Sequence, residues 1–269
     1  MKIHPLQSWN NPFKKESLKN NFSLGMFIVS ASSIISECCS VSGVEWMAVD
    51  MEASPATRHD LIHIAQSLNG TSVVLFARVA ENNKQYIEAA LDVGAHGVIV
   101  PKISCAADAL SAVQASYYQP LGERGLNPIR CSAYFKEVAS YLKNANDSVL
   151  CIPQIETKRG VENLDEIASI KGVSGLFIGC GDLAADYGRS GEFESSDMIR
   201  ARKLVLQACK KYGLISGIFA YSDELARKYI DEGFGMIGIG NEIKFLQSGL
   251  EDSIRKIIKC QIDTVANEL

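Results

Sequence analysis

The chain has 269 residues, of which 47% are hydrophobic and 22% are charged, and its 27 Lys and Arg against 31 Asp and Glu give a net charge of −4. This balance excludes a disordered or low-complexity chain. The pI of 5.7 argues against nucleic acid or an anionic membrane surface as a partner, so we expect small molecules or copies of the chain itself. A length near 270 residues allows one large domain with a sizeable core.

The N-terminal region predicts neither a membrane anchor nor a secretory signal. The longest stretch without charge, residues 20–36, is interrupted by several polar side chains and is too polar to span a membrane. Residues 1–20 are polar and lack the apolar segment of a signal peptide, so we interpret them as a short N-terminal extension of a cytoplasmic protein. Residues 21–269 then form one domain. The eight cysteines form no CxxC pair, which predicts reduced thiols rather than zinc ligands or disulfides.

Short apolar runs rich in β-branched residues predict eight strands, at 24–30, 44–50, 72–78, 96–101, 149–156, 173–179, 214–220 and 236–240. Most of these runs are continuously apolar, as expected for parallel strands that are covered on both faces. Helical patterns separate them at 56–68, 84–93, 106–117, 133–144, 161–169, 197–212 and 222–232, and a closing helix is expected at 243–267. Alternating strands and helices predict an α/β fold with a parallel sheet.

A repeated phrase indicates how these units are built. Residues 92–100 and 231–239 each consist of a helix end, a capping glycine and the next strand. No G-x-G-x-x-G motif follows the first strand, so a dinucleotide site is not indicated. Eight such units predict a closed (β/α)₈ TIM barrel. Two long connections, 102–148 and 180–213, would lie at its C-terminal face, where barrel active sites are built.

Polar residues at the ends of the predicted strands form a chemically coherent set, namely Asp50, Glu52, Arg78, Lys102, Gln154, Glu156 and Asp182. Glu156 and Asp182 could supply two hard oxygen ligands to Mg²⁺ or Mn²⁺. Arg78 offers a guanidinium fork for a carboxylate, so the set could hold a 2-oxo acid. Each residue also has a structural interpretation, because a strand-end Asp is often a helix N-cap and an acidic residue often pairs with a structural Arg.

The ordered motifs of residues 20–260 resemble the HpcH/HpaI aldolase family, the metal-dependent class II pyruvate aldolases related to 2-dehydro-3-deoxyglucarate aldolase. The matching phrases are Leu24-Gly25-Met26-Phe27, Val49-Asp50-Met51-Glu52, Arg78, residues 92–98, Gly122-Glu123-Arg124-Gly125, residues 153–158 and residues 177–183. The resemblance implies a divalent metal, Mg²⁺ or Mn²⁺, as cofactor and a 2-oxo acid, pyruvate or oxaloacetate, as substrate.

The resemblance also assigns roles. It implies that Glu156 and Asp182 are metal ligands and that Arg78 binds the substrate carboxylate. Asp50 and Glu52 join Arg78 as catalytic candidates. The candidates for substrate binding are Arg78, Gln154, Gly181, Asp182 and, more weakly, Arg124 and Arg130. An arginine in the long loop that holds the last two has a structural role as its alternative interpretation.

One departure from the family concerns the general base. The family has a His after the second strand where this chain has Ala53, and alanine cannot move a proton. A metal-bound water or Glu52 are the candidate substitutes. His59 and His63, four residues apart on the next helix, are expected to face solvent. A second departure is Cys180, which stands where the family commonly has Pro.

Three functions remain open from the sequence. The first is an aldolase, a lyase that forms or cleaves a carbon–carbon bond next to pyruvate. The second is a citrate-synthase-type condensation of oxaloacetate with acetyl-CoA for siderophore biosynthesis, in which Arg130 would meet the extra carboxylate. The ketone of oxaloacetate needs no deprotonation, so the absence of a base at Ala53 is less damaging to this reaction. The third is a barrel that binds a 2-oxo acid without turnover.

The closing helix bears on assembly. Its apolar stripe comprises Ile243, Phe245, Leu246, Leu250, Ile254, Ile257, Ile258 and Ile262. Such a stripe usually packs on its own barrel. In the resembled family, however, the last helix is exchanged between neighbours in a hexamer built from dimers, so we expect a homo-oligomer, either a hexamer or another dimer-based assembly.

Overall fold

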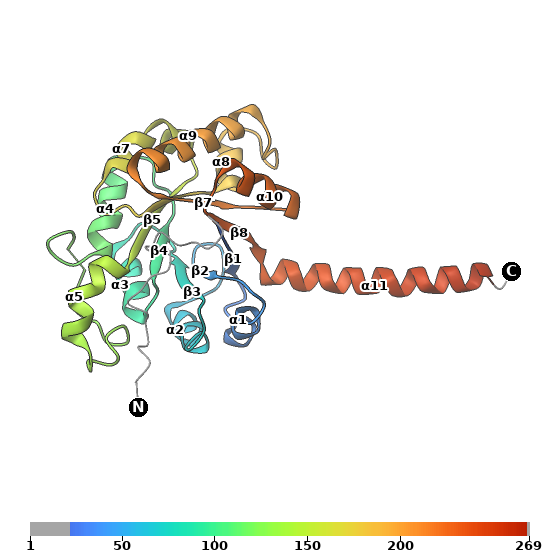
Figure 1. The fold of residues 1–269 in the computed structure, drawn as a ribbon, viewed down its shortest axis with the longest axis horizontal. Coiled ribbons are helices and arrows are strands. Elements are labelled where there is room, and N and C mark those ends of the chain that lie inside the picture. The colour runs from blue at the N-terminus through green and yellow to red at the C-terminus, as the bar shows by residue number, and fades with distance from the viewer. Residues whose placement is uncertain (1–21, 268–269) are drawn as a thin grey trace.

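The computed structural model describes residues 22–267, with side chains through residue 258, and it forms a closed barrel of parallel strands surrounded by helices (Figure 1). The predicted TIM-barrel fold is therefore confirmed. The predicted extension at 1–20 lies outside the described residues. No helix in the described part of the chain is long and apolar enough to cross a membrane.

Every predicted strand is present, with slightly shorter bounds in most cases. The strands are β1 (Ser23–Ile28), β2 (Trp46–Asp50), β3 (Val74–Arg78), β4 (Gly97–Val100), β5 (Leu150–Ile155), β6 (Gly175–Ile178), β7 (Ile215–Phe219) and β8 (Met236–Asn241). Each pairs in parallel with its neighbour in sequence, and β1 pairs with β8 to close the barrel. All strand C-termini consequently meet at one rim.

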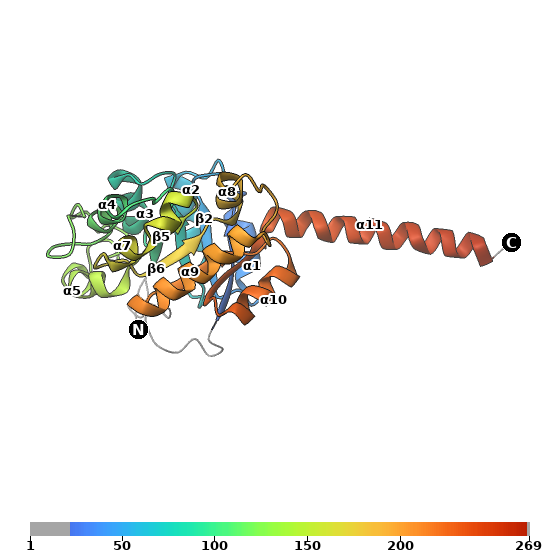
Figure 2. The same cartoon turned by 90° about the horizontal axis from the view of Figure 1, so that it is seen from above.

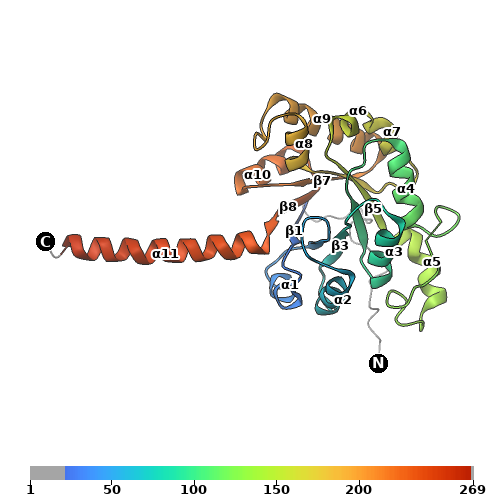
Figure 3. The same ribbon diagram turned by 180° about the vertical axis from the view of Figure 1, so that it is seen from behind.

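The helices are α1 (Ser33–Ser40), α2 (Arg58–Ser67), α3 (Lys84–Val93), α4 (Ala106–Ser116), α5 (Val138–Ser148), α6 (Lys158–Glu162), α7 (Leu164–Ser169), α8 (Cys180–Asp186), α9 (Ser196–Tyr212), α10 (Asp223–Glu232) and α11 (Glu242–Asn267). Figures 1 and 3 show α1 to α10 around the barrel. The helix predicted at 133–144 corresponds to α5, and its predicted start is wrong, because Ala133, Tyr134 and Phe135 have left-handed backbone angles and delay the helix to Val138.

Aromatic side chains fill the inside of the barrel. The buried interior cluster comprises Phe27, Trp46, Ala48, Val74, Phe76, Ile99, Leu150, Ile152, Phe177 and Met236. Trp46 lies edge-to-face against both Phe76 and Phe177, and Gly25 leaves the room that its indole needs. The interior is therefore a packed floor beneath the rim, and ligands can enter only from the ends of the strands.

Glycine caps connect helices to strands where the repeated phrase predicts them. Gly94 ends α3 with φ 108° and Gly233 ends α10 with φ 103°, and both conformations favour glycine. Seven cysteines have described side chains and all are free thiols, four of them buried: Cys131, Cys151, Cys180 and Cys209.

Helix α11 departs from the usual barrel arrangement. Figures 1 and 2 show it extending away from the barrel instead of folding back along the outer face of β8 and β1. Every described side chain from residue 243 to residue 258 is exposed. The apolar stripe predicted for this helix is therefore open to solvent in the single chain, except that Ile262 lies outside the described side chains.

Candidate active site

The predicted strand-end residues meet at the C-terminal rim. Asp50 ends β2 and Arg78 ends β3, and the two residues are register partners in adjacent strands. Lys102 follows β4, and Gln154 and Glu156 lie at the end of β5. Hydrogen bonds and ion pairs connect these residues and Glu52 in one continuous network.

Arg78 and Asp50 form a bidentate ion pair at the rim. The Arg78 Nε donates to Asp50 Oδ1 at 2.9 Å and Nη2 donates to Oδ2 at 2.5 Å, while the Glu52 carboxylate lies 3.6 Å from Nε. Burial alone would lower the pKa of Arg78, but the hydrogen bonds and charge of Asp50, together with Glu52, raise it. The guanidinium stays charged and is held in one orientation.

Asp50 also organises the loop that follows β2. Its Oδ1 accepts hydrogen bonds from the backbone N–H groups of Glu52 and Ala53, both at 3.1 Å. Asp50 therefore has the structural role that the sequence left open for an acidic strand-end residue, because it pairs with Arg78 and shapes its own loop. The same contacts fix the guanidinium at the edge of a cavity.

Glu156 is a buried carboxylate in a crowded position. Its Oε1 accepts the backbone N–H of Lys102 at 2.6 Å, and its Oε2 accepts a hydrogen bond from Gln154 Nε2. Burial is the main cause that raises the pKa of Glu156, those two hydrogen bonds lower it, and the charges of Glu52 and Asp182 raise it again, with a net increase.

Lys102 links the two halves of the rim. Its backbone has φ 60°, a left-handed conformation that is strained for lysine, and its N–H is held by Glu156. The side chain is 71% exposed, and its Nζ lies 3.4 Å from Glu52 Oε1. Lys102 therefore joins the Glu52 end of the network to the Glu156 end.

The turn between β6 and α8 completes the rim. A Cβ on Gly179 would lie 2.7 Å from Glu156 Oε2 and 2.8 Å from Gln154 Nε2, so only glycine allows the turn to pass this close. Gly181 and Asp182 follow in the first turn of α8, whose N-cap is Gly179. The alternative interpretation of Asp182 as a helix N-cap is therefore wrong.

A cavity of about 310 Å³ opens at this rim. Its lining residues are Phe27, Val29, Asp50, Arg78, Gln154, Phe177, Gly179, Cys180, Gly181, Asp182, Phe219, Tyr221 and Asn241. Phe27 and Phe177 belong to the aromatic floor, and the Arg78 guanidinium lies 5.2 Å from the centre of the Phe27 ring. The cavity thus combines a charged wall with an apolar base, which suits a small anionic substrate.

The oxygen atoms near the cavity fit a hard divalent cation. Glu156 follows β5 and Asp182 lies in the first turn of α8, just after the adjacent strand β6. Gln154 Oε1 is buried and has no hydrogen-bond partner among the described residues. The described residues contain no cluster of three or more His, Cys, Asp or Glu side chains arranged to hold a metal, so an ion here would keep several positions for water and substrate.

Arg124 and Arg130 do not line the cavity, and the expectation that they bind substrate is corrected here. The Arg124 Nη2 donates to Tyr141 at 2.6 Å and to Asp92 at 3.2 Å in a buried contact. The Arg130 Nη1 donates to the Val93 carbonyl at 2.6 Å. Both guanidinium groups have structural roles, joining the long β4–β5 connection to α3.

The histidines lie away from the cavity in the described part of the chain. His59 and His63 are exposed on α2 and contact each other, with 3.3 Å between their Nε2 atoms. Burial lowers the pKa of His96 to about 4, and its Nδ1 accepts the Leu75 N–H at 3.1 Å.

Ala53 is exposed and does not line the cavity. Burial also raises the pKa of the Cys180 thiol to about 12, so this lining residue stays protonated.

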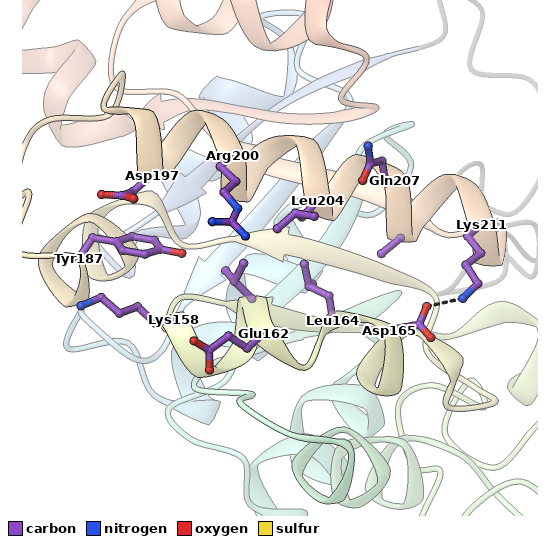
Figure 4. Close-up of a pocket in the computed structure, with 12 residues that line it drawn as sticks. Lys158, Glu162, Leu164, Asp165, Tyr187, Asp197, Arg200, Leu204, Gln207 and Lys211 are labelled. Atoms are coloured by element: carbon purple, nitrogen blue, oxygen red, sulfur yellow. Dashed lines mark hydrogen bonds and ion pairs between the residues drawn. The ribbon is translucent and has the colours of Figure 1, made fainter.

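A larger cavity of about 560 Å³ lies outside the barrel, between α6 and α7 on one side and α9 on the other (Figure 4). At one end it gathers Lys158, Glu162, Tyr187 and Arg200, and an ion pair of Lys211 with Asp165 at 2.5 Å closes the other end. Its charges are of mixed sign, and none of the strand-end residues lines it. We therefore place the candidate site at the rim.

Sequence reasoning missed the aromatic wall on the β7 side of the cavity. Phe219 ends β7, Tyr221 follows it, and both line the cavity. The candidates predicted at strand ends are ionisable and amide side chains, and no aromatic residue is among them. The signal that could have found them is their position at the end of a predicted strand, 214–220.

Comparison with known proteins agrees with this geometry. The sequence profile described as HpcH/HpaI aldolase/citrate lyase matches residues 23–248. The chain belongs to this HpcH/HpaI family. A 2-dehydro-3,6-dideoxy-6-sulfogluconate aldolase of Pseudomonas putida is 35% identical over 225 residues, which cover 84% of this chain and 88% of the relative.

Two further similarities support the family's chemistry and fold. A 2-keto-3-deoxy-L-rhamnonate aldolase of Klebsiella pneumoniae is 30% identical over 243 residues, covering 90% of this chain and 91% of the relative. The crystal structure of an HpcH/HpaI aldolase/citrate lyase family protein from Burkholderia cenocepacia J2315 has a TM-score of 0.87 and 28% identity, covering 92% and 99% of the two chains. This HpcH/HpaI protein is thus an enzyme of the aldolase type, a carbon–carbon lyase.

Proposed function

We propose that the chain forms and cleaves a carbon–carbon bond next to a 2-oxo acid bound at the barrel rim. The observation that carries this proposal is the cavity itself, which is lined both by an oriented cation, Arg78, and by the turn that bears Asp182. The Nε and Nη2 atoms of Arg78 are committed to Asp50, so its Nη1 edge is the one that can bind the substrate carboxylate.

A divalent ion, Mg²⁺ or Mn²⁺, is the proposed cofactor, with Glu156 and Asp182 as its protein ligands. Bound there, it would act as a Lewis acid that stabilises negative charge on the carbonyl oxygen of the substrate. Gln154 lies beside Glu156 and orients it through their hydrogen bond. Gly179 lets the turn approach Glu156, and Gly181, which has no Cβ, would let the backbone N–H groups of the α8 turn come close to the bound acid.

Proton transfer needs a group other than residue 53. Burial is the main cause that raises the pKa of Tyr221, with smaller contributions from the nearby Cys180 and Asp182, and burial keeps the Cys180 thiol protonated. Neither residue is therefore proposed as the base. Glu52 is the proposed acceptor, because its carboxylate lies 3.6 Å from the Nε atom of Arg78 at the cavity edge. Lys102, 3.4 Å from Glu52, would stabilise the ionised carboxylate.

The test of the proposed function is turnover. The purified chain with Mg²⁺ or Mn²⁺ is incubated with 2-keto-3-deoxy-L-rhamnonate and with 2-dehydro-3,6-dideoxy-6-sulfogluconate, the substrates named for the two relatives, and released pyruvate is measured with lactate dehydrogenase. We expect pyruvate release from a 2-keto-3-deoxy acid. Thiol release from acetyl-CoA with oxaloacetate, and no pyruvate, would instead establish the condensation. Silence in both assays would identify a binder.

The metal ligands are tested by binding. Glu156→Gln and Asp182→Asn each remove one charged ligand, so Mn²⁺ measured by calorimetry should bind at least tenfold more weakly and most turnover should be lost. The matched control is Asp186→Asn, on the same helix and outside the cavity. Unchanged Mn²⁺ affinity in both ligand variants would contradict the proposed site.

We further propose a homo-oligomer in which α11 packs against a second copy of the chain. The support is its exposed apolar face, from Phe245 to Ile258, since a long apolar stripe is costly in water. The hexamer implied by the family resemblance is the proposed assembly.

The free thiols of the described region also support a cytoplasmic setting.

A further inference from the structure

Tyr221 lies on the wall of the cavity opposite Arg78, and its surroundings indicate a specific use for its hydroxyl. A Cβ on Gly181 would lie 2.8 Å from the Tyr221 hydroxyl oxygen, so the phenol sits directly over the Gly181–Asp182 turn. Burial, Cys180 and Asp182 raise the pKa of Tyr221, while Arg78 lowers it, with a net increase. A tyrosine hydroxyl is protonated at neutral pH, so at this position it can donate a hydrogen bond into the cavity.

The ring of Tyr221 is held by a stack. Phe193, from the loop between α8 and α9, lies parallel to it with 4.3 Å between ring centroids and 3° between ring planes. Phe219 packs edge-on at 4.9 Å, and Lys244 Nζ donates to the Tyr221 carbonyl at 2.7 Å. Ring and backbone are thus both fixed, although the side chain is 43% exposed.

A buried arginine holds the loop that carries Phe193. Arg202, on α9, has 0% exposed side-chain surface, and its Nη1 donates to the Phe193 carbonyl at 2.7 Å. Its other nitrogens pair with Glu232 at 2.8 Å and with Glu194 at 3.1 Å. Burial of a guanidinium is costly unless its ion pairs and hydrogen bonds compensate for the lost hydration. Arg202 therefore fixes the backbone at Phe193, from which the stack reaches the cavity.

We infer that Tyr221 is a substrate-binding residue whose hydroxyl donates a hydrogen bond to the carboxylate of the 2-oxo acid, and that Phe193 positions it. The carboxylate would lie between the Nη1 edge of Arg78, the backbone N–H groups of the α8 turn, and the phenol. This inference rests on the proposed function, because it assumes that a 2-oxo acid occupies the cavity. It adds a neutral side-chain donor to the guanidinium and the backbone N–H groups.

The experiment is a calorimetric titration of the full chain with pyruvate in the presence of Mg²⁺, which requires no second substrate. Tyr221→Phe keeps the ring and its stack, and removes only the hydroxyl. We expect its pyruvate Kd to rise at least tenfold, the usual cost of deleting a hydrogen bond to a charged group. The matched control is Tyr86→Phe, because Tyr86 is equally exposed at 43% and lies on α3, outside the cavity.

The positioning role of Phe193 is tested in a double-mutant cycle. Phe193→Ala should weaken pyruvate binding in the original chain, and it should have little further effect in the Tyr221→Phe background, since no hydroxyl remains to be positioned. Phe193→Tyr, which preserves the stack, should restore binding. An equal effect of Phe193→Ala in both backgrounds would overturn this part of the inference.

The outcomes separate the two proposals. If the original chain does not bind pyruvate, the proposed function fails. If it binds pyruvate and Tyr221→Phe binds equally well, the proposed function stands and the role of the hydroxyl is overturned. If Tyr221→Phe alters the KM for the second substrate but leaves pyruvate binding unchanged, the assignment to the carboxylate is likewise overturned.

Discussion

Arg78 shows how one side chain serves structure and site together. Its ion pair with Asp50 occupies two of its nitrogens, and the residue also lines the cavity, where the third nitrogen is left for substrate. A lone arginine would sample several rotamers, whereas this one is fixed before substrate arrives, which reduces the entropy lost on binding. The same logic applies to Glu156, whose two oxygens are held by Lys102 and Gln154.

Much of the site could be predicted at this scale because barrel topology brings strand ends together. Asp50, Arg78, Gln154 and Glu156 were found from position alone, since each lies at the end of an apolar run. Arg124 could not be excluded in this way. Whether a loop arginine faces substrate or a buried acid depends on the loop's path, and its pairing with Asp92 is a contact between distant residues.

The missing histidine gives the first prediction. Ala53→His places an imidazole in the loop that Asp50 organises, where the family has its base. If the chain is an aldolase limited by proton transfer, the substitution should raise aldol turnover, toward the roughly 10²–10⁴-fold that a positioned general base contributes. Steady-state pyruvate release at several pH values measures this.

The condensation of oxaloacetate with acetyl-CoA predicts the opposite effect of Ala53→His. If the chain condenses oxaloacetate with acetyl-CoA, the new side chain occupies space left for the second substrate, so thiol release should fall. If Ala53→His changes neither reaction, residue 53 does not face the reacting groups. The exposure of Ala53 to solvent is compatible with that outcome.

At the scale of elements, the β6–α8 turn brings the first turn of α8 close to the Glu156 carboxylate, which follows β5. Gly179 is the point of contact, because its missing Cβ leaves room for Glu156 and Gln154. Helix α8 itself was not predicted, since its seven residues are too few for a periodic pattern to emerge. Helix α1, with eight residues, was missed for the same reason.

The second prediction tests this turn. In Gly179→Ala the new methyl group would lie 2.7 Å from Glu156 Oε2, so the turn must move away from β5. We expect at least a tenfold loss of kcat/KM and weaker Mn²⁺ binding, with the fold retained by circular dichroism.

The control for this variant is Gly213→Ala. Gly213 ends α9 with φ 67° and has open space around it, so an added methyl group costs about 1 kcal/mol of stability through backbone strain alone. It should leave kcat/KM unchanged. Wild-type kinetics in Gly179→Ala would show that the close approach has no part in the site.

The long connections were only partly predictable. The pattern at 133–144 favours a helix, yet three consecutive left-handed residues precede Val138. Such a run depends on contacts that local propensity does not include, among them the hydrogen bond from the Tyr134 N–H to the Ile129 carbonyl at 2.7 Å. The aromatic wall was missed because Phe193 and Tyr221 meet only in the folded barrel.

At the scale of the whole molecule, α11 is the feature that the single barrel does not explain. Strand and helix periodicity predicted both the barrel and the amphipathic last helix, but periodicity cannot tell whether an apolar face packs on its own chain or on a neighbour. The extension of α11 away from the barrel (Figure 2) favours a neighbour.

The third prediction concerns mass. Light scattering at micromolar concentration should give an oligomer, with a hexamer of this 29.3 kDa chain as the expected species. Replacing two exposed apolar residues of α11, in Leu250→Glu with Ile254→Glu, should shift the protein toward monomers by charging the apolar face. The control is Glu251→Gln with Asp252→Asn, on the same helix. A monomer in the unmodified chain would refute the assembly.

The central claim, that the rim binds a 2-oxo acid and forms its enolate, is tested most directly by hydrogen–deuterium exchange at the methyl group of pyruvate. The chain is mixed with pyruvate and Mg²⁺ in deuterated buffer, and the loss of the methyl signal is followed by proton NMR. We predict exchange that stops on chelation and falls at least tenfold in Arg78→Lys, which keeps a cation beside Asp50 and loses the planar fork. Pyruvate that binds without exchange, together with thiol release from oxaloacetate and acetyl-CoA, would contradict the account.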